Sequence, residues 1–166
     1  MVTIREATKG DLEQMIHLGI NCFPDDFMDG KNAENTVKNA EDWFMERYSA
    51  RTFSRYHVAE QDGKIVGYIF HLMIGGLSGV VQLEQIGVDT EYRRQGIGNE
   101  LIRASEKFWK QYLPERFGKP LYKMMLTTSV INNKAHCLYA NCGFKHDTTM
   151  KEIYWGNDEE IWIKEF

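Results

Sequence analysis

A mixed α/β fold is predicted by three features of the sequence. Residues 56–88 contain three successive segments rich in β-branched and aromatic side chains, which is typical of strands. Residues 97–112 repeat apolar side chains at helical spacing, and residues 121–165 then alternate between strand-like and helix-like segments. With the N-terminal elements, these features predict a mixed sheet in the order β-α-α-β-β-β-α-β-α-β-β.

One strand and one helix are expected first. Residues 3–7 (TIREA) are typical of a short strand. Thr8 and Asp11 then resemble a capping box, with aspartate in place of glutamate. Apolar residues recur at helical spacing over residues 12–23, which predicts a helix there.

This helix is expected to break at Pro24. The acidic residues Asp25, Asp26 and Asp29 follow, and they are predicted to lie in a loop. Residues 33–48 predict a second helix, whose aromatic side chains are expected to pack on the sheet.

The middle of the chain predicts three consecutive strands. Residues 56–61 and 64–74 flank Asp62 and Gly63, a pair that is typical of a tight hairpin turn. A glycine-rich loop separates them from a third strand over residues 80–88.

An amphipathic helix is predicted over residues 97–112. Pro114, Gly118 and Pro120 are expected to end it, because proline has no N–H for the helical hydrogen bond and glycine often follows a helix end. The side chains expected on its buried stripe are Ile97, Leu101, Ala104, Phe108 and Tyr112.

Four further elements are expected after this helix. Residues 156–158 predict a turn, and the acidic residues 158–160 are placed in that loop. The predicted elements are a strand over 121–128, a helix over 132–141 and strands over 144–154 and 161–165.

Length and charge limit the classes of function. The chain has 166 residues, so a single domain over residues 1–166 is predicted. Its net charge of −4 argues against a bulk electrostatic grip on nucleic acid. No apolar run reaches the roughly 18 residues of a membrane span, and the first residues lack a secretory apolar region. The number of cysteines is odd, 3, and without a signal peptide this predicts reduced thiols and a cytoplasmic location. The charge and the missing span predict neither nucleic-acid nor membrane partners. The 5 histidines show no metal-ligand spacing, so no metal is predicted.

The most informative segment is Arg93–Gly98 (RRQGIG), between a predicted strand and a predicted helix. A helix start leaves about four backbone N–H groups unpaired, and its dipole favours negative charge. Gly96 and Gly98 let a diphosphate approach the backbone, and Arg93 and Arg94 add positive charge. The segment therefore predicts a phosphate-bearing ligand, with a plain glycine turn at a basic helix start as the alternative.

The segment from Val88 to Gly98 resembles the acetyl-CoA-binding segment of the GNAT superfamily of N-acetyltransferases. The family pattern Q/R-x-x-G-x-G/A is matched by Arg93, Gly96 and Gly98. Residues 132–144 resemble the second signature of the family. The resemblance covers the order of elements along the whole chain and implies a GNAT-like acyl-CoA N-acyltransferase fold, with acetyl-CoA as co-substrate and no metal.

The resemblance also implies how acetyl-CoA is held. The pantetheine arm would pair with a strand edge like an added strand, and the N–H of Val88 would stabilise the oxyanion. Arg93 would reach a phosphate or solvent, and Asn132 would cap its helix and contact the CoA arm. The implied cofactor-binding residues are Ile86, Gly87, Val88, Arg93, Arg94, Gln95, Gly96, Ile97, Gly98, Asn99, Asn132 and Tyr139.

Two catalytic residues are implied. Tyr139 matches a tyrosine that the family commonly places near the CoA sulfur, where it would protonate the thiolate; packing is its alternative role. Glu84 would accept the proton of the amine directly or through water, and a solvent-facing carboxylate is the alternative. Some members instead carry a glutamate on the following strand, where this chain has Thr127 or Thr128. The base is therefore Glu84 or bulk solvent.

These observations predict an acetyl-CoA-dependent N-acetyltransferase that acts on a primary amine by direct attack in a ternary complex. A non-catalytic acyl-CoA-binding module and a transferase of larger acyl groups stay open as alternatives. The amine is a small molecule or a peptide, and an acidic loop that rims its cleft would favour a cationic one. Exposed strand edges allow a homodimer, which members of the family often form.

Overall fold

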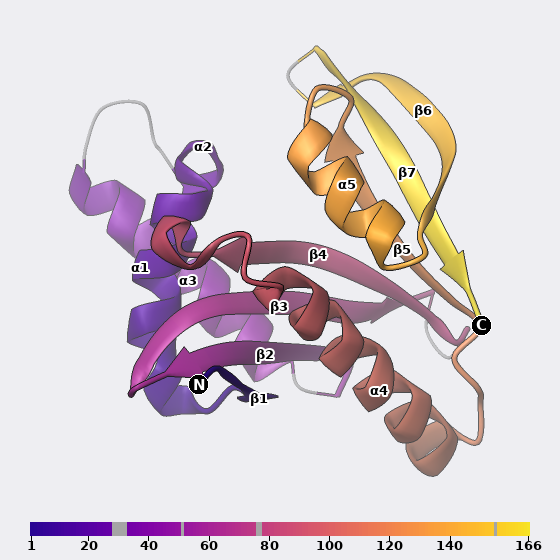
Figure 1. Ribbon diagram of the computed structural model, residues 1–166, viewed down its shortest axis with the longest axis horizontal. Coiled ribbons are helices and arrows are strands. Elements are labelled where there is room, and N and C mark those ends of the chain that lie inside the picture. The colour runs from indigo at the N-terminus through magenta and orange to yellow at the C-terminus, as the bar shows by residue number, and fades with distance from the viewer. Residues whose placement is uncertain (28–32, 51, 76–77, 155) are drawn as a thin grey trace. The chain divides into compact units, whose positions relative to one another are not determined.

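The computed structural model describes residues 1–27, 33–50, 52–75, 78–154 and 156–166. The chain forms two compact units, each built from two segments (Figure 1). Unit 1 contains Met1–Phe70 and Gln85–Ala104, and unit 2 contains His71–Glu84 and Ser105–Phe166. Asp29, which the sequence places in an acidic loop, lies outside the described residues.

The strands form one seven-stranded mixed sheet in the order β1-β2-β3-β4-β5-β7-β6. The pair β4 and β5 is parallel, whereas β1–β2, β5–β7 and β6–β7 are antiparallel. The predicted mixed α/β fold is therefore confirmed. The strands are β1 (Thr3–Glu6), β2 (Ser54–Gln61), β3 (Lys64–Ile74), β4 (Val80–Val88), β5 (Lys123–Ser129), β6 (Lys145–Tyr154) and β7 (Asn157–Glu165).

The helices follow the predicted order with one addition, the short helix α2. A single 3-10 turn precedes α1 and another precedes α4; these are η1 (Lys9–Asp11) and η2 (Thr90–Tyr92). The helices are α1 (Leu12–Cys22), α2 (Pro24–Phe27), α3 (Ala33–Ser49), α4 (Ile97–Phe117) and α5 (Asn133–Asn141). None of the helices in the described part of the chain is both long and apolar enough to cross a membrane.

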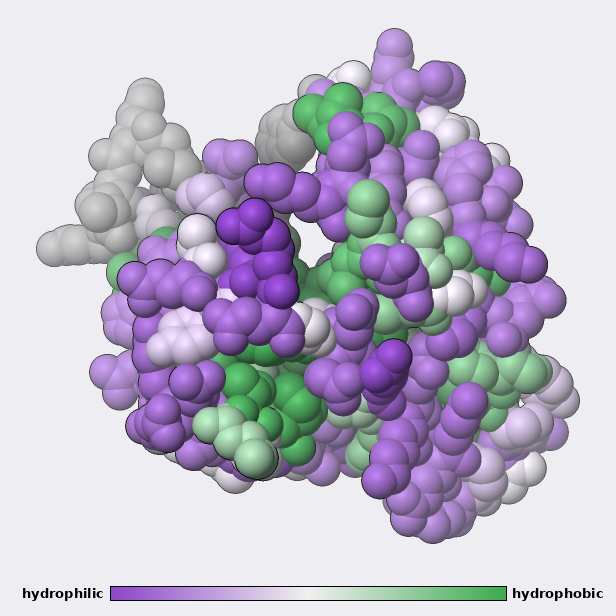
Figure 2. All heavy atoms as spheres, viewed as in Figure 1, coloured by the Kyte–Doolittle hydropathy of each residue, from purple (hydrophilic) through white to green (hydrophobic). Residues whose placement is uncertain are grey.

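The core of unit 1 is aromatic. Phe44 of α3 is fully buried, and its ring lies 5.4 Å from the ring of Tyr68 on β3 and 5.7 Å from that of Tyr56 on β2. Helix α1 approaches α3 closely, because a Cβ added at Gly19 would lie 2.7 Å from the Phe44 ring. On the face that Figure 2 shows, hydrophilic residues cover most of the surface, and hydrophobic residues gather around β1.

A charged network fixes the start of unit 1. The Arg5 guanidinium donates to both carboxylate oxygens of Asp11 at 2.7 Å and to Glu60 at 2.7 Å. Asp11 also accepts from the backbone N–H of Thr8 at 2.7 Å, as the sequence pattern predicts for a cap. The hydrogen bonds from Arg5 lower the pKa of Asp11 to about 2.

The predicted loop positions of the acidic residues are wrong. Asp25 and Asp26 lie in α2, because Pro24 occupies the first helical position, where its missing N–H costs nothing. Glu159 and Glu160 lie within β7, which starts at Asn157, and Glu160 is only partly exposed. Pairing with β5 and β6 therefore outweighs the turn signal of residues 156–158.

Gly118, one of the residues predicted to end α4, follows its last residue, Phe117, but the ending predicted at Pro114 and part of the predicted buried stripe are wrong. Pro114 lies inside α4, and the N–H of Gly118 donates to the Pro114 carbonyl at 3.0 Å as the helix ends. The proline lies on the exposed side of the last turns, where a missing hydrogen bond is least costly. Ala104, Phe108 and Tyr112 are only half-buried, and the buried stripe contains Ile97, Leu101, Ile102, Ser105, Trp109 and Leu113.

Unit 2 is held by polar contacts around α4 and α5. The indole N–H of Trp109 donates to Nδ1 of His71, and both side chains are fully buried. The Lys164 ammonium of β7 donates to Glu106 on α4 and, at 2.7 Å, to the carbonyl of Cys142 at the end of α5. Because one lysine bonds both helices, it fixes them on the same strand.

Burial of His57 is expected to make stability depend on pH. Its side chain is buried on β2, and burial, assisted by Arg55, lowers its pKa from 6.5 to about 4. Below pH 6.5 the unfolded chain binds a proton that the folded chain does not, so stability falls as pH drops from about 6.5 to 4. The loss is about 3 kcal/mol. Urea denaturation across this range should show the slope, and His57→Gln should flatten it.

The matched control is the same substitution at His146, which is exposed on β6. His146→Gln is expected to leave the slope as in the wild type. Equal slopes for His57→Gln and the wild type would contradict the assignment to His57.

Candidate active site

Strand β4 offers an open backbone edge in unit 1. β4 is the last strand of this unit in the sheet order, and its pairing with β5 covers only Val80, Val81 and Gln82. The N–H of Asp89 donates to the carbonyl of Val66 on β3 at 2.9 Å. Since successive residues of a strand direct their N–H groups to opposite edges, the N–H of Val88 points away from β3.

Gly87 lets helix α1 approach this part of β4. A Cβ at this position would lie 3.1 Å from Cε1 of Tyr68 and 3.2 Å from the sulfur of Cys22, the last residue of α1. The burial of β4 alternates without a break at this glycine. The end of α1 thus lies over the end of β4 (Figure 1).

The turn between β4 and α4 presents backbone N–H groups. Arg94 and Gly96 both have left-handed φ values, 63° and 83°. Left-handed residues in such a turn direct neighbouring N–H groups toward one concave side, which favours an anion. In the described part of the chain, the N–H groups of Gly96, Ile97 and Gly98 have no acceptor, and the first helical bond runs from Glu100 to Gly96 at 3.1 Å.

The side chains of this turn differ in direction. Arg93 folds back, and its Nε donates to the carbonyl of Val88 at 2.8 Å, a contact that the sequence did not predict. The Arg94 side chain is exposed, and Gln95 donates to the carbonyl of Glu91 at 3.4 Å. Lys64 pairs with Asp89 at 2.9 Å, which lowers the pKa of that carboxyl group. Arg93 and Arg94 are therefore the residues that bring positive charge to the turn.

Gln85 is a buried polar residue on the helix-covered face of β4. Its Oε1 accepts from the hydroxyl of Tyr68 at 2.5 Å, and its Nε2 donates to Oδ2 of Asp26 at 3.0 Å. Burial raises the pKa of Asp26 above its ordinary value. Sequence reasoning missed this chain of hydrogen bonds; its only signal was a glutamine at an inward position of an apolar strand.

Glu84 lies on the other face of β4. Burial alternates without interruption along the strand, so Glu84 shares its face with Ile86 and Val88, as the pattern predicts. Its carboxylate is exposed and accepts from Nε2 of Gln82 at 2.7 Å.

Tyr139 and Asn132 belong to unit 2. Tyr139 is the buried residue of α5, and burial raises its pKa to about 12. No residue in the described ranges gives its hydroxyl a hydrogen-bond partner, while its ring packs against Phe144. Asn132 caps α5 as predicted, because its side chain accepts from the N–H of Ala135 at 3.3 Å, and it also donates to Thr128.

The structure brings the predicted residues together in two groups. Unit 1 holds the strand edge at residues 86–88 and the turn at residues 93–99, whereas unit 2 holds Glu84, Asn132 and Tyr139. Each group has the local geometry described above. Among the described residues, no three histidine, cysteine, aspartate or glutamate side chains form a metal site.

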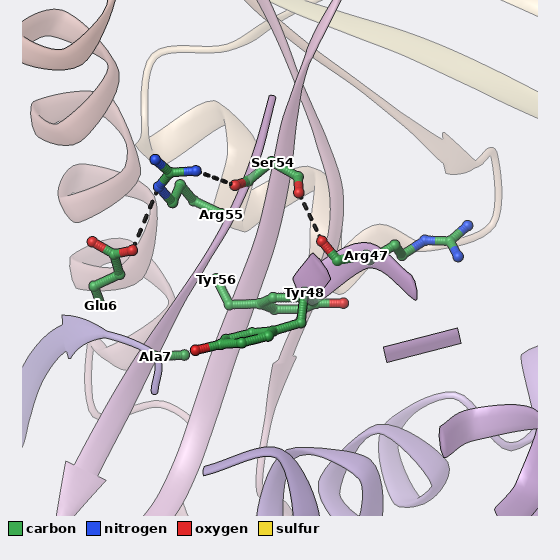
Figure 3. Close-up of a pocket in the computed structure, with 7 residues that line it drawn as sticks. All are labelled: Glu6, Ala7, Arg47, Tyr48, Ser54, Arg55 and Tyr56. Carbon is green, nitrogen blue, oxygen red and sulfur yellow. Dashed lines mark hydrogen bonds and ion pairs between the residues drawn. The ribbon is translucent and has the colours of Figure 1, made fainter. Parts of the chain in front are cut away.

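A small pocket lies elsewhere in unit 1, between β1, β2 and the end of α3 (Figure 3). Several of its polar groups are engaged: Arg55 pairs with Glu6 at 3.4 Å, and the hydroxyl of Ser54 donates to the carbonyl of Arg47 at 2.8 Å. The Arg47 guanidinium points away from the pocket and lies 4.0 Å over the ring of Trp43. The pocket contains none of the predicted site residues.

Comparison with known proteins decides the family. The model of the acetyltransferase (GNAT) family matches residues 12–144, which is most of the chain and includes the open edge of β4, the turn and α5. The chain belongs to the GNAT family. It is therefore an N-acetyltransferase, and transfer of an acetyl group from acetyl-CoA to an amine is the general activity of this family.

Several relatives of this GNAT protein have names that include an acceptor. It is 29% identical over 160 residues to the N-alpha-acetyltransferase of Sulfurisphaera tokodaii. The aligned residues make up 91% of this chain and 84% of the relative. Two solved structures share the fold at 21% identity. The ribosomal-protein-S18-alanine N-acetyltransferase from Escherichia coli has a TM-score of 0.71, covering 99% of this chain and 94% of the other. The spermidine N-acetyltransferase from Vibrio cholerae, in complex with CoA and spermine, has a TM-score of 0.76, covering 99% and 95%.

Proposed function

We propose that this chain acetylates a primary amine by direct attack on acetyl-CoA in a ternary complex. The observation that carries the proposal is the row of N–H groups at Gly96, Ile97 and Gly98, which face a concave turn without an acceptor. Such a row at the start of a long helix suits a diphosphate. A Cβ at Gly96 would meet no atom within 4 Å, so the backbone is open to a ligand.

Other residues would bind the rest of acetyl-CoA. The pyrophosphate would rest on the backbone of Arg94 to Asn99, with Arg94 free to add charge. The pantetheine arm would pair with the edge at Ile86 and Val88, and Asn132 would contact the arm from its cap. The N–H of Val88 would stabilise negative charge on the thioester oxygen, which such donors do best in a water-poor site.

Two proton transfers complete the proposed reaction. Tyr139 would protonate the departing thiolate, a role supported by a phenol that stays protonated and has no other partner in the described ranges. The proton of the amine would pass to Glu84 or to solvent. Holding both substrates together supplies much of the rate, because the attack becomes effectively unimolecular.

The proposed acceptor is the α-amino group of a peptide chain. The N-alpha-acetyltransferase from Sulfurisphaera tokodaii, similar over most of this chain, supports this choice. The test follows free thiol from acetyl-CoA with an alanine-terminal tetrapeptide, with its N-acetylated form as the blank and with spermidine as a second acceptor. Turnover of the free peptide is expected. Turnover of neither amine would overturn the proposal, and faster turnover with succinyl-CoA would indicate a larger acyl donor.

A substitution at Gly96 tests the phosphate turn. Gly96→Asp is expected to raise the Kd of acetyl-CoA at least about 10-fold, because a carboxylate then competes with the diphosphate for the same N–H groups. Calorimetric titration measures this change.

Gly63 offers a matched control in the β2–β3 turn. Its φ is 80°, close to the 83° of Gly96, and a Cβ there would likewise meet no atom within 4 Å. Gly63→Asp is expected to shift thermal stability as much as Gly96→Asp and to leave the Kd unchanged. An equal Kd of acetyl-CoA for both variants would contradict the proposal that the turn binds the diphosphate.

Further predictions accompany this function. We expect one domain over residues 1–166, a cytoplasmic location, no membrane or nucleic-acid partner and a homodimer. Light scattering at several protein concentrations tests the last of these.

A further inference from the structure

Asp26 stands at the end of a hydrogen-bond chain that begins in the core of unit 1. Tyr68 and Gln85 are 0% and 6% exposed, whereas Asp26 reaches the surface and only its bond to Gln85 is partly buried. The chain fixes Oδ2 of Asp26 through Nε2 of Gln85, at 3.0 Å. Within the described ranges Oδ1 has no partner, so one carboxylate oxygen is held and the other is free.

The held carboxylate and the N–H of Val88, the proposed oxyanion donor, lie at the same end of β4. Gln85 precedes Val88 by three residues, about 10 Å along a strand. The Sγ atom of Cys22, four residues before Asp26, lies 3.7 Å from the carbonyl oxygen of Val88. Both contacts place the end of α1 and α2 over the last residues of β4, on the face that Gly87 leaves open to them.

A glutamine at this inward position requires an explanation. A buried amide must satisfy both of its ends, and an aliphatic side chain would fill the same space without that demand. Gln85 meets the demand by bonding Tyr68 and Asp26, and the result is a carboxylate with a fixed orientation. Burial also makes that carboxylate a stronger base than a fully hydrated one.

We propose that Asp26 is a catalytic residue that binds the ammonium group of the acceptor and takes its proton, with Gln85 as its positioning residue. This inference rests on the proposed function. The ammonium gives one proton to Asp26, and Asp26 later releases it to solvent. The neutral nitrogen attacks the thioester carbon; the N–C bond forms and the C–S bond breaks. The nitrogen then loses its second proton to solvent, while the thiolate gains one from Tyr139, which solvent reprotonates.

This assignment replaces Glu84 as the base. Glu84 lies on the opposite face of β4 from Gln85 and accepts from Gln82. Asp26 also selects the substrate: it favours an amine that arrives as an ammonium ion over a neutral one.

The test compares Asp26→Asn with Asp25→Asn, the same change one residue earlier on α2. Asparagine at position 26 keeps an oxygen for Gln85, so the fold is retained. The probes are the alanine-terminal tetrapeptide and the same peptide with 3,3,3-trifluoroalanine first, whose amine is neutral at pH 7. The measured quantity is the rate of peptide acetylation in a single turnover, with enzyme and acetyl-CoA in excess over peptide, so that slow transfer can also be measured.

With the alanine peptide, Asp26→Asn is expected to lose about 100-fold in rate, within the range of general base catalysis, and Asp25→Asn less than about 2-fold. With the trifluoroalanine peptide, the loss at Asp26 should shrink to about 5-fold or less, since no proton has to be removed before attack. A purely structural role would slow both peptides alike.

Three results overturn the proposal separately from the proposed function. They are wild-type rates for Asp26→Asn, equal losses on both peptides, and a large loss for Glu84→Gln without one for Asp26→Asn. If the wild type binds acetyl-CoA but acetylates neither the peptide nor spermidine, the proposed function itself fails.

Discussion

Replacing Tyr139 by phenylalanine is expected to lower kcat about 100-fold. General acid catalysis contributes roughly 10²–10⁴-fold, and a phenol whose pKa is raised to about 12 gives up its proton less readily than free tyrosine, so the lower end applies. The Kd of acetyl-CoA should change less than about 2-fold, because the lost proton acts on the leaving thiolate rather than on the bound thioester. Thiol release under saturating substrates measures kcat.

The stability of the protein is expected to be the same with and without the Tyr139 hydroxyl. The Tyr139 hydroxyl has no hydrogen-bond partner among the described residues, so its removal should leave the melting temperature unchanged. Tyr122→Phe is the matched control, since Tyr122 is exposed in the same unit. An unchanged kcat for Tyr139→Phe would leave Tyr139 with a packing role against Phe144 alone.

Phe44→Ala is expected to lower the free energy of unfolding by about 3–5 kcal/mol. Phe44 is 0% exposed and lies at the centre of the aromatic core, where α1, α3 and the sheet meet. Its removal leaves a cavity that rigid rings on several sides cannot fill. Against a typical total of about 5–15 kcal/mol, this is a large share. Urea denaturation monitored by circular dichroism measures the loss.

Phe53→Ala is the control for this prediction. Phe53 is 46% exposed, so the same truncation there should cost less than about 1 kcal/mol. Phe44→Leu keeps most of the volume and should cost less than Phe44→Ala, which gives a folded variant for comparison if the alanine variant does not fold. Equal losses at positions 44 and 53 would contradict the core that the structure describes.

Much of the fold could be predicted because its signals are local. Alternating apolar residues and the Asp62–Gly63 turn placed β3 and β4 at their observed bounds. The errors occurred where tertiary contacts override local preference. Sheet pairing draws the acidic residues 158–160 into β7, and packing of Trp109 and Leu113 carries α4 past Pro114.

The candidate site divides in the same way. The turn before α4 was predictable, because two glycines and two arginines before a helix have a local physical meaning. The cap at Asn132 was predictable for the same reason. By contrast, nothing local predicts that Arg93 folds back onto Val88 or that Gln85 bonds Asp26, 59 residues away in sequence.

The sequence by itself thus indicated the family, the element order and the glycine turn before α4, since each depends on residues close together along the chain. The tertiary structure decided which polar groups are held and which are free. The Asp26 carboxylate gains its fixed orientation and raised pKa only where α2 meets β4. The Tyr139 phenol is likewise shifted only by burial in the folded unit. Desolvation and long-range hydrogen bonds depend on neighbours that folding supplies, and these determine the chemistry of both groups.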